Sequence, residues 1–457
     1  MATTRSASIR VQLARAAGRA AGLTSRRLGR GGGTTLPGVV ARFVEPRVAA
    51  GLARRLPQGT IVVSGTNGKT TTTRLLSALL TAAGRRVVHN RAGANLMSGV
   101  ATALLDGGGD VGLFEVDEAT VPAAIHELRP RLVVCLNLFR DQLDRYGELN
   151  TLASRWASAL ADLPADALAL FNADDPLIAN LGSGLRCRMS YFGLDSPNQQ
   201  LPAMQHAADS IYCPRCASLL AFDGVYYGHL GRYHCPGCGW RRPERDYSAR
   251  DVQLTAHGPS HFRLQNACLE TALPGLYNVY NVVAAASAGL SLGLKPELVQ
   301  AVVKDFAGAF GRTELVDIGG KRLRLLLAKN PVGFNEVIRT LLLDPGPLHL
   351  YLALNDRIAD GQDVSWIWDV DFELLAGRAA IVLVGGDRAE DLAVRLKYAG
   401  LPAGQLQLMR DHGSAVRELL SQTPDGATAY VVPTYTAMLD LRRALAASGV
   451  VRQFWDD

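Results

Sequence analysis

The chain has 457 residues, of which 48% are hydrophobic and 20% are charged, and its formal net charge is +6. These values are typical of an ordinary soluble globular protein of two to four domains. No apolar run could span a bilayer and no apolar signal core opens the chain, so we predict a cytoplasmic protein. In that compartment seven cysteines indicate metal binding or free thiols and argue against disulfides.

The first 55 residues hold many arginines and almost no acid, so the basic excess is uneven. Residues 9–23 have helical spacing with one basic face, residues 29–35 form a break, and residues 36–56 predict a second helix. We expect a solvated helix packed on the following domain, because its apolar face is mostly Ala. Contact with anionic lipid head groups is the alternative.

Residues 60–73 read as a buried strand, a glycine-bearing loop and a helix start, which is the context of a phosphate-binding loop. In such a loop Lys69 reaches the terminal phosphates and the Thr70 hydroxyl ligates Mg²⁺. The strict pattern requires Gly where this chain has Val63, so the loop is not that of the common GTPases and kinases. The nucleotide-binding candidates are Gly65, Thr66, Asn67, Gly68, Lys69, Thr70 and Thr71.

Strands and helices then alternate, which predicts a doubly wound α/β sheet with ligands at the carboxyl ends of its strands. The strands expected after the loop lie at 86–89, 111–117, 132–137 and 168–176. Glu115, Asp117 and Glu118 fall at one such end. A carboxylate there could hold the Mg²⁺ shared with Thr70, or all three could be surface acids.

Cys213, Cys216, Cys235 and Cys238 form two Cys-x-x-Cys pairs with 18 residues between them. This spacing predicts a zinc ribbon at about 205–245, built on a small hairpin. Four thiolates leave no open coordination position, so the zinc would be structural. The remaining cysteines, Cys135, Cys187 and Cys268, are predicted to be buried core thiols.

Further along, Asn278 and Asn281 share one face of a predicted helix, and residues 307–314 read as a hinge into a second small α/β domain. Lys329 follows a strand of that domain and is either a cation facing the nucleotide or a plain surface lysine. Residues 355–373 are acidic but contain Trp366 and Trp368. Since aromatics are enriched at interfaces, we expect a docked surface there.

The motif Gly-Thr-Asn-Gly-Lys-Thr at 65–70 resembles the loop of the Mur ligases and folylpolyglutamate synthetases, which activate a carboxylate as an acyl phosphate. The ribbon and the segments 328–336, 360–369 and 434–439 resemble a lipid II-amidating branch of the Mur ligase family, over about residues 40–450. The resemblance implies a Mur ligase-like central P-loop domain carrying the ribbon and a C-terminal Rossmann-like α/β domain. The expected units are 1–55, 56–312 and 313–457.

The resemblance also implies site roles. Glu115 would be the Mg²⁺ ligand, Asn281 would approach adenine, Arg312 would reach the γ-phosphate and Lys329 would face the acyl phosphate. Residues 137–147 would lie near the active site, with Gln142 where many members have His. The cofactors implied are ATP, Mg²⁺ and structural Zn²⁺.

The implied reaction is ATP-dependent amidation of the D-glutamate α-carboxyl in lipid II at the inner face of the membrane. A GatD-like glutamine amidotransferase would supply ammonia, since this chain has no Cys-His glutaminase motif of its own. The family implies that this chain lends the partner a carboxylate. We favour Asp369, which follows packed aromatics, over Asp360 and Asp363. The alternatives are a folylpolyglutamate-type ligase and a nucleic-acid-binding ATPase. No interleaved basic-aromatic surface supports the second, so we expect no nucleic-acid partner.

Overall fold

The computed structural model describes residues 2–27, 35–90, 93–141, 149–307 and 313–447, so most of the predicted break at 29–35 and of the hinge lies outside the described residues. The chain opens with the helices α1 (Ala2–Arg27), α2 (Leu36–Val44) and α3 (Val48–Ala53). The prediction of one helix over 36–56 is wrong. Pro46 disfavours a helical conformation at Glu45, which is extended (φ −141°, ψ 100°) and ends α2.

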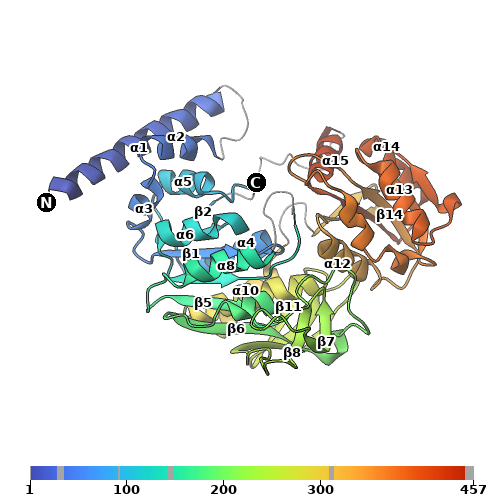
Figure 1. Ribbon diagram of the computed structural model, residues 1–457. Coiled ribbons are helices and arrows are strands. Elements are labelled where there is room, and N and C mark those ends of the chain that lie inside the picture. Colours follow the sequence, from blue (N-terminus) through green and yellow to red (C-terminus); the bar gives the residue numbers. More distant parts are fainter. Residues whose placement is uncertain (1, 28–34, 91–92, 142–148, 308–312, 448–457) are drawn as a thin grey trace.

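A nine-stranded sheet in the order β11-β10-β9-β6-β5-β4-β1-β3-β2 forms the larger part of the protein (Figure 1). Its strands are β1 (Thr60–Ser64), β2 (Val87–His89), β3 (Val111–Glu115), β4 (Leu132–Cys135), β5 (Leu168–Asn172), β6 (Arg188–Asp195), β9 (Tyr247–Gln253), β10 (Ser260–Leu264) and β11 (Ala267–Thr271). Parallel pairing runs from β2 to β9, and β10 and β11 add an antiparallel edge. The predicted α/β class is confirmed.

Both faces of this sheet are covered, because successive residues of each strand point to opposite sides. Ile61 and Val63 of β1 belong to one core and Val62 to the other. The first face carries α4 (Lys69–Ala82), α10 (Leu276–Ser291) and α11 (Pro296–Asp305). The second carries α3, α5 (Met97–Asp106), α6 (Val121–Leu128), α8 (Leu149–Leu160) and α9 (Pro176–Asn180).

The cysteine-rich segment forms a separate antiparallel hairpin between β6 and β9, made of β7 (Ala221–Tyr227) and β8 (Leu230–His234). Its small core includes Tyr233 and Trp240, whose ring centroids lie 5.2 Å apart. The expectation for the three remaining cysteines is wrong for one of them. Cys135 and Cys187 are buried, but Cys268 is exposed, because it points to the uncovered side of β11 while its neighbour Leu269 points into the core.

A second sheet of six strands, in the order β12-β13-β17-β14-β15-β16, follows the hinge. Its strands are β12 (Thr313–Ile318), β13 (Lys321–Leu326), β14 (Leu348–Ala353), β15 (Ala379–Gly385), β16 (Leu406–Leu408) and β17 (Thr428–Pro433). One face carries α12 (Pro331–Leu341), α13 (Ala389–Tyr398), η3 (Ser365–Asp369) and η4 (Phe372–Leu375). The other carries α14 (His412–Gln422) and α15 (Tyr435–Ala447).

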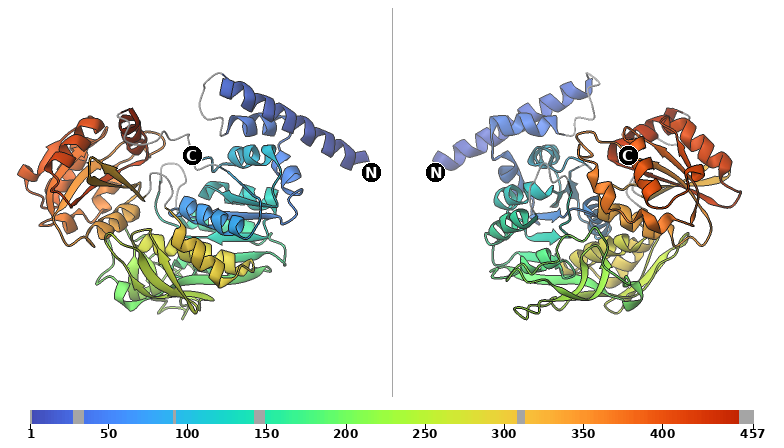
Figure 2. Two further views of the ribbon diagram at one scale, coloured as in Figure 1. Left: turned by 180° about the vertical axis from the view of Figure 1, so that it is seen from behind. Right: turned by 45° about the vertical axis from the view of Figure 1, so that its right-hand side comes forward.

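The C-terminal sheet unit lies beside the central one, with α12 at the junction (Figure 1). Hydrogen bonds between Asn67 and Asn330 join the loop after β1 to the start of α12. The junction therefore lies at the carboxyl ends of the central strands, where ligands of a doubly wound sheet bind. The N-terminal end of α1 points away from the C-terminal unit (Figure 2). Within the described ranges, no helix is long and apolar enough to cross a membrane.

Candidate active site

The loop between β1 and α4 has a backbone that requires glycine. Gly65 (φ +147°) and Gly68 (φ +88°) both adopt conformations that side chains rarely tolerate. A Cβ at Gly68 would lie 1.9 Å from Oδ1 of Asn281, so the start of α4 approaches α10 closely. Such a turn lets backbone N–H groups point at bound phosphate oxygens, and the N-terminus of α4 adds positive potential.

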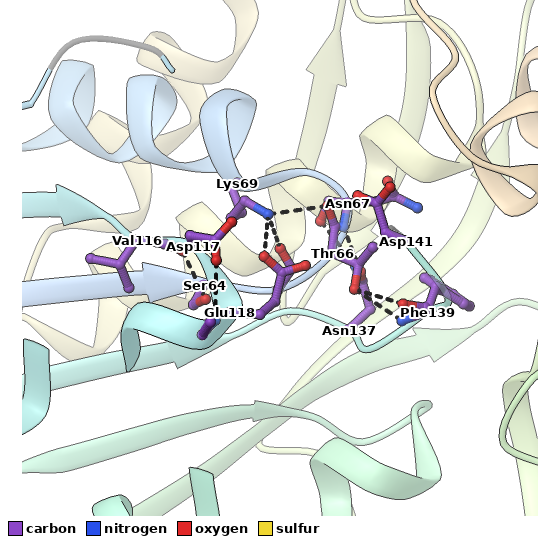
Figure 3. Close-up of polar contacts among 12 residues, drawn as sticks. Ser64, Thr66, Asn67, Lys69, Val116, Asp117, Glu118, Asn137, Phe139 and Asp141 are labelled. Atoms are coloured by element: carbon purple, nitrogen blue, oxygen red, sulfur yellow. Dashed lines mark hydrogen bonds and ion pairs between the residues drawn. The ribbon is translucent and has the colours of Figure 1, made fainter. Parts of the chain in front are cut away.

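The loop is held from the end of β4 (Figure 3). The Asn137 side chain accepts from the Asn67 N–H at 2.8 Å and donates to the Asn67 carbonyl at 3.1 Å. The Thr66 hydroxyl accepts from the Phe139 N–H at 3.0 Å. Asn137 and Phe139 had no role in the sequence interpretation beyond their nearness to the site. Because these contacts fix Thr66 and Asn67 against the segment after β4, the loop is preorganised before any phosphate binds.

Lys69 is buried and its ammonium is already fully engaged (Figure 3). It donates to the carbonyls of Gly65 at 2.6 Å and Thr66 at 3.3 Å, and to Glu118 at 2.9 Å. Burial lowers the pKa of Lys69, but the charge and hydrogen bond of Glu118 raise it above its ordinary value. Although burial opposes it, Lys69 also lowers the pKa of Glu118, so the pair is ionised. Bound phosphate would have to replace Glu118 as the partner of Lys69.

The Thr70 hydroxyl fits a cation ligand. It is buried and, in the part of the chain that the structure describes, has no hydrogen-bond partner. Glu115, Asp117 and Glu118 lie close enough that each raises the pKa of Lys69 through its charge. Glu115 ends β3 with its backbone bonded to the Asn90 side chain, at 3.0 Å and 2.8 Å. An orphaned hydroxyl beside carboxylates is a donor set that suits Mg²⁺.

Two contacts from the C-terminal unit reach the phosphate loop and the segment after β4. Lys329 makes an ion pair with Asp141, and Asn330 pairs with the Asn67 side chain at 3.0 Å. Burial raises the pKa of Asp141, although the charge of Lys329 opposes the rise. Lys329 therefore lies at the junction, where it contacts the segment that follows β4. Arg312 and the 142–147 part of the predicted active-site loop lie outside the described residues.

A small cavity of about 70 Å³ lies between α10 and α12. Asn281 lines it and donates to Asn278 at 3.1 Å. Glu336 enters the same cavity from α12. Its carboxylate is only 2% exposed, neither oxygen has a hydrogen-bond partner among the described residues, and burial raises its pKa to about 7. The sequence interpretation missed Glu336. Its one signal was its spacing of four residues from Val332 and Thr340 on the buried face of α12.

The four ribbon cysteines come together. Their sulfurs lie within 4.8 Å of one another, with Sγ–Sγ distances of 3.7 Å (Cys213 to Cys238) and 3.4 Å (Cys216 to Cys235). A tetrahedral zinc with ligands at 2.3 Å separates its sulfurs by about 3.8 Å. The arrangement therefore fits a structural zinc.

The three aspartates considered as the carboxylate for the partner differ in burial and in their hydrogen bonds. Asp360 is buried and holds the N–H and hydroxyl of Thr436. Asp363 accepts from the Ser365 N–H at the start of η3 at 2.8 Å. Asp369 is half-buried, with one oxygen 3.2 Å from Arg140 of the central unit. Among these three, Asp369 is the one without a bond to its own loop or to α15 in the described structure.

Comparison with known proteins agrees with this geometry. Residues 63–214 match the family model "Mur ligase middle domain", and residues 327–438 match "MurT ligase C-terminal". A pseudomurein peptide ligase type C from Methanothermus fervidus has the same fold, with a TM-score of 0.67 at 20% identity, covering 87% of this chain and 80% of that one. MurF ligase from Thermotoga maritima, solved in complex with ADP, gives a TM-score of 0.62 at 13% identity over 89% and 85%.

Fold and phosphate loop thus define a Mur ligase-type, ATP-dependent ligase. One curated relative is the "Lipid II isoglutaminyl synthase (glutamine-hydrolyzing) subunit MurT" of Streptococcus pneumoniae, which is 34% identical over 98% of this chain and 99% of its own length. The chain belongs to the MurT family.

Proposed function

We propose that this protein amidates the α-carboxyl of D-glutamate in the lipid II stem peptide, consuming ATP and ammonia that a glutaminase subunit releases from glutamine. The observation that carries the proposal is its near full-length similarity to a subunit named for this synthase. The geometry supports the proposal, because a preorganised phosphate loop faces a second unit across a polar junction. Carboxylate activation requires ATP and the carboxylate to be held in a fixed relative position, and such a junction could hold them so.

The chemistry follows in two steps. A carboxylate oxygen attacks the γ-phosphorus of ATP, the bond to the β–γ bridging oxygen breaks, and ADP leaves. Ammonia then attacks the carbonyl carbon of the acyl phosphate, the bond from that carbon to the phosphate oxygen breaks, and phosphate and a proton depart. The first step spreads charge over the equatorial phosphate oxygens, so cations positioned around them lower its barrier.

The residues divide this work. Lys69 would neutralise phosphate charge after leaving Glu118, and the loop from Gly65 to Thr71 would hold the β- and γ-phosphates through its N–H groups. Thr70 with Glu115 or Glu118 would hold Mg²⁺, which when bound offsets phosphate charge. Lys329 would face the acyl phosphate from the C-terminal unit. Arg312 stays a proposal from the family alone.

The nucleoside would occupy the cavity between α10 and α12. Asn281 offers an amide to adenine there, and Glu336 offers a carboxyl whose oxygens accept no hydrogen bond in the described chain, although Arg339 lies 3.9 Å from one of them. Since a buried carboxyl without hydrogen bonds costs free energy, a ligand hydroxyl or amino group at Glu336 would recover it. The present cavity is smaller than a nucleoside needs, so the two units would have to separate first.

The glutaminase would meet the C-terminal unit near η3 and α13. Trp368 is 53% exposed and Tyr398 is 74% exposed, and their rings lie 5.7 Å apart. Exposed aromatics of this kind are enriched at protein interfaces. We further propose that the ribbon binds one structural zinc, and that residues 1–55, 56–312 and 313–457 are separate units. The protein would act at the inner face of the membrane, where its substrate lies.

The test is to co-purify the protein with a glutaminase and to incubate lipid II with ATP and glutamine. Mass spectrometry should show one carboxyl of the stem peptide converted to a carboxamide. Ammonium chloride should replace glutamine when the glutaminase is absent. Addition of an amino acid in place of ammonia would indicate another Mur- or folylpolyglutamate-type ligase. ATP hydrolysis that depends on nucleic acid would argue against both lipid II amidation and an amino acid-adding ligase.

A further inference from the structure

Helix α1 presents a continuous apolar stripe to solvent. Ile9, Leu13 and Leu23 are 61%, 59% and 59% exposed. Ala16 and Ala20 are also exposed and complete the spacing of four, three, four and three residues. Residues so spaced share one helix face.

A second stripe on the opposite side of α1 packs on the protein. Its members are buried and mostly small: Val11, Ala14, Gly18, Gly22 and Ser25. A Cβ at Gly18 would lie 2.7 Å from the Pro37 carbonyl oxygen and 3.1 Å from Ala41, so α1 and α2 are in close contact. The small residues fix α1 on the body, while the Ile and Leu residues face out. The alanines of this helix are therefore divided between the two sides, since Ala14 is buried whereas Ala16 and Ala20 are exposed.

Helix α2 also exposes apolar side chains. Leu36, Val39 and Phe43 recur at helical spacing and are 45%, 51% and 90% exposed. α1 and α2 lie side by side at one extremity of the molecule, and the N-terminal end of α1 points away from the C-terminal unit (Figures 1 and 2). A flat surface could therefore meet this pair without meeting the active-site junction.

The charge of residues 1–55 indicates what kind of surface they would bind. Residues 1–55 contain eleven arginines and one acid, Glu45, and so carry a net charge of +10 in a chain whose total is +6. Arg15 and Arg19 donate to the carbonyl of Leu105 at the end of α5. Arg10, Arg47 and Arg54 are exposed. Basic residues near an anionic leaflet are attracted to its surface charge.

We propose that the exposed face of α1 and α2 docks on an anionic lipid bilayer, lying in the interface with its apolar side chains inserted. An apolar stripe with arginines beside it is the composition of a helix that lies on a membrane. A second copy of this chain would bring +10 against +10, so self-association through this face is disfavoured. The proposal deepens the proposed function, because it brings the site to a lipid-linked substrate, but lipid binding itself needs no substrate.

The test is co-sedimentation of the full chain with vesicles of phosphatidylcholine alone and with phosphatidylglycerol added. We expect binding to the anionic vesicles only, weakened by high salt. The double variant Leu13→Gln/Phe43→Gln should bind these vesicles at least about tenfold more weakly than the parent. The double variant Leu219→Gln/Leu408→Gln, changed at sites 59% and 55% exposed elsewhere, should bind as the parent does. Thermal melting would establish that both variants fold.

Equal binding to both vesicle types, or an unchanged Leu13→Gln/Phe43→Gln variant, would overturn the proposal. Loss of self-association in that variant, with no vesicle binding by the parent, would assign the face to a second copy. Amidation of a water-soluble, short-chain lipid II analogue should be the same in parent and variant. If no form amidates that analogue while vesicle binding persists, the proposed function fails and the docking surface stands.

Discussion

At the scale of single residues, the sequence located the acids that follow β3 but did not single out the one that pairs with Lys69. Glu115, Asp117 and Glu118 were all possible Mg²⁺ ligands at the end of this strand, and the resemblance favoured Glu115. In the structure Glu118 begins the short helix η1 (Glu118–Thr120), which turns its side chain onto Lys69. The three-residue helix η1 therefore determines which acid pairs with Lys69, and no periodicity in the sequence predicts such a short element.

The buried pair shapes the result expected for Lys69→Ala. Amidation should fall by at least about 100-fold, because the cation that offsets phosphate charge is gone. The change also leaves Glu118 charged, buried and without its cation, which should cost about 3–5 kcal/mol of unfolding free energy. Lys69→Ala/Glu118→Gln should recover the stability without the activity. Denaturant unfolding and ammonia-driven turnover measure the two effects.

Lys397→Ala, at an exposed position on α13, serves as the matched control and should leave both quantities unchanged. Near-parental turnover in Lys69→Ala would remove the phosphate-loop assignment.

Glu336 predicts a pH dependence of stability. Burial raises its folded-state pKa to about 7, above the ordinary 4.5, so the folded protein holds the proton more tightly than the unfolded chain. Unfolding free energy should therefore fall as pH rises from about 4.5 through about 7, by at most about 3 kcal/mol. Glu336→Gln should flatten this dependence and be the more stable protein at pH 8. Melting curves at pH 5 and pH 8 provide the measurement.

Glu244→Gln changes an exposed carboxyl and should keep the parental pH dependence. If Glu336→Gln kept it as well, another group would be responsible.

At the scale of elements, regular residue spacing predicted the type of structure well, whereas the ends of the helices were predicted only in part. The Cys-x-x-Cys pairs predicted a hairpin module because metal ligation restricts their spacing. The helix break at Pro46 was missed, although proline is itself the signal. The exposure of Cys268 could not be predicted, because it depends on which side of β11 is covered in the folded protein.

The ribbon predicts a zinc-dependent stability. Elemental analysis of protein purified without chelator should find one zinc per chain. Cys235→Ser should lower the melting temperature more than it alters the turnover of the surviving enzyme, since a lost ligand removes folding free energy. Cys268→Ser, at an exposed thiol outside the cluster, should do neither. Protein without zinc, or a fully stable Cys235→Ser variant, would contradict the structural role.

At the scale of the whole molecule, the two α/β sheets were predictable because each repeats strand and helix, but their contact was not. Lys329 meets Asp141 and Asn330 meets Asn67 across 188 and 263 residues of sequence. These contacts depend on how the two sheets and their helices come together, which local patterns do not encode. They also place one unit over the phosphate loop of the other, so nucleotide entry and catalysis should both depend on their relative position.

The partner's reaction gives the last prediction, which concerns Asp369. A glutaminase histidine works best when a carboxylate orients its ring, and this chain would supply that carboxylate. Asp360 is held by Thr436 and Asp363 by Ser365, whereas Asp369 contacts Arg140 through side chains 38% and 36% exposed. An ion pair so exposed contributes at most about 1 kcal/mol, so Asp369 can exchange its partner.

Asp369→Asn should therefore reduce glutamine-dependent amidation by about tenfold or more while sparing amidation driven by ammonium chloride. Asp363→Asn is the matched control on the same loop and should affect neither rate. If both rates fall together in Asp369→Asn, the residue serves the synthetase site, where Arg140 links it to the central unit. If only Asp363→Asn loses the glutamine-dependent rate, that exposed cap residue supplies the carboxylate instead. Binding of the glutaminase, measured by size-exclusion chromatography, should be retained in both variants, because the exposed aromatic rings of Trp368 and Tyr398 remain in place.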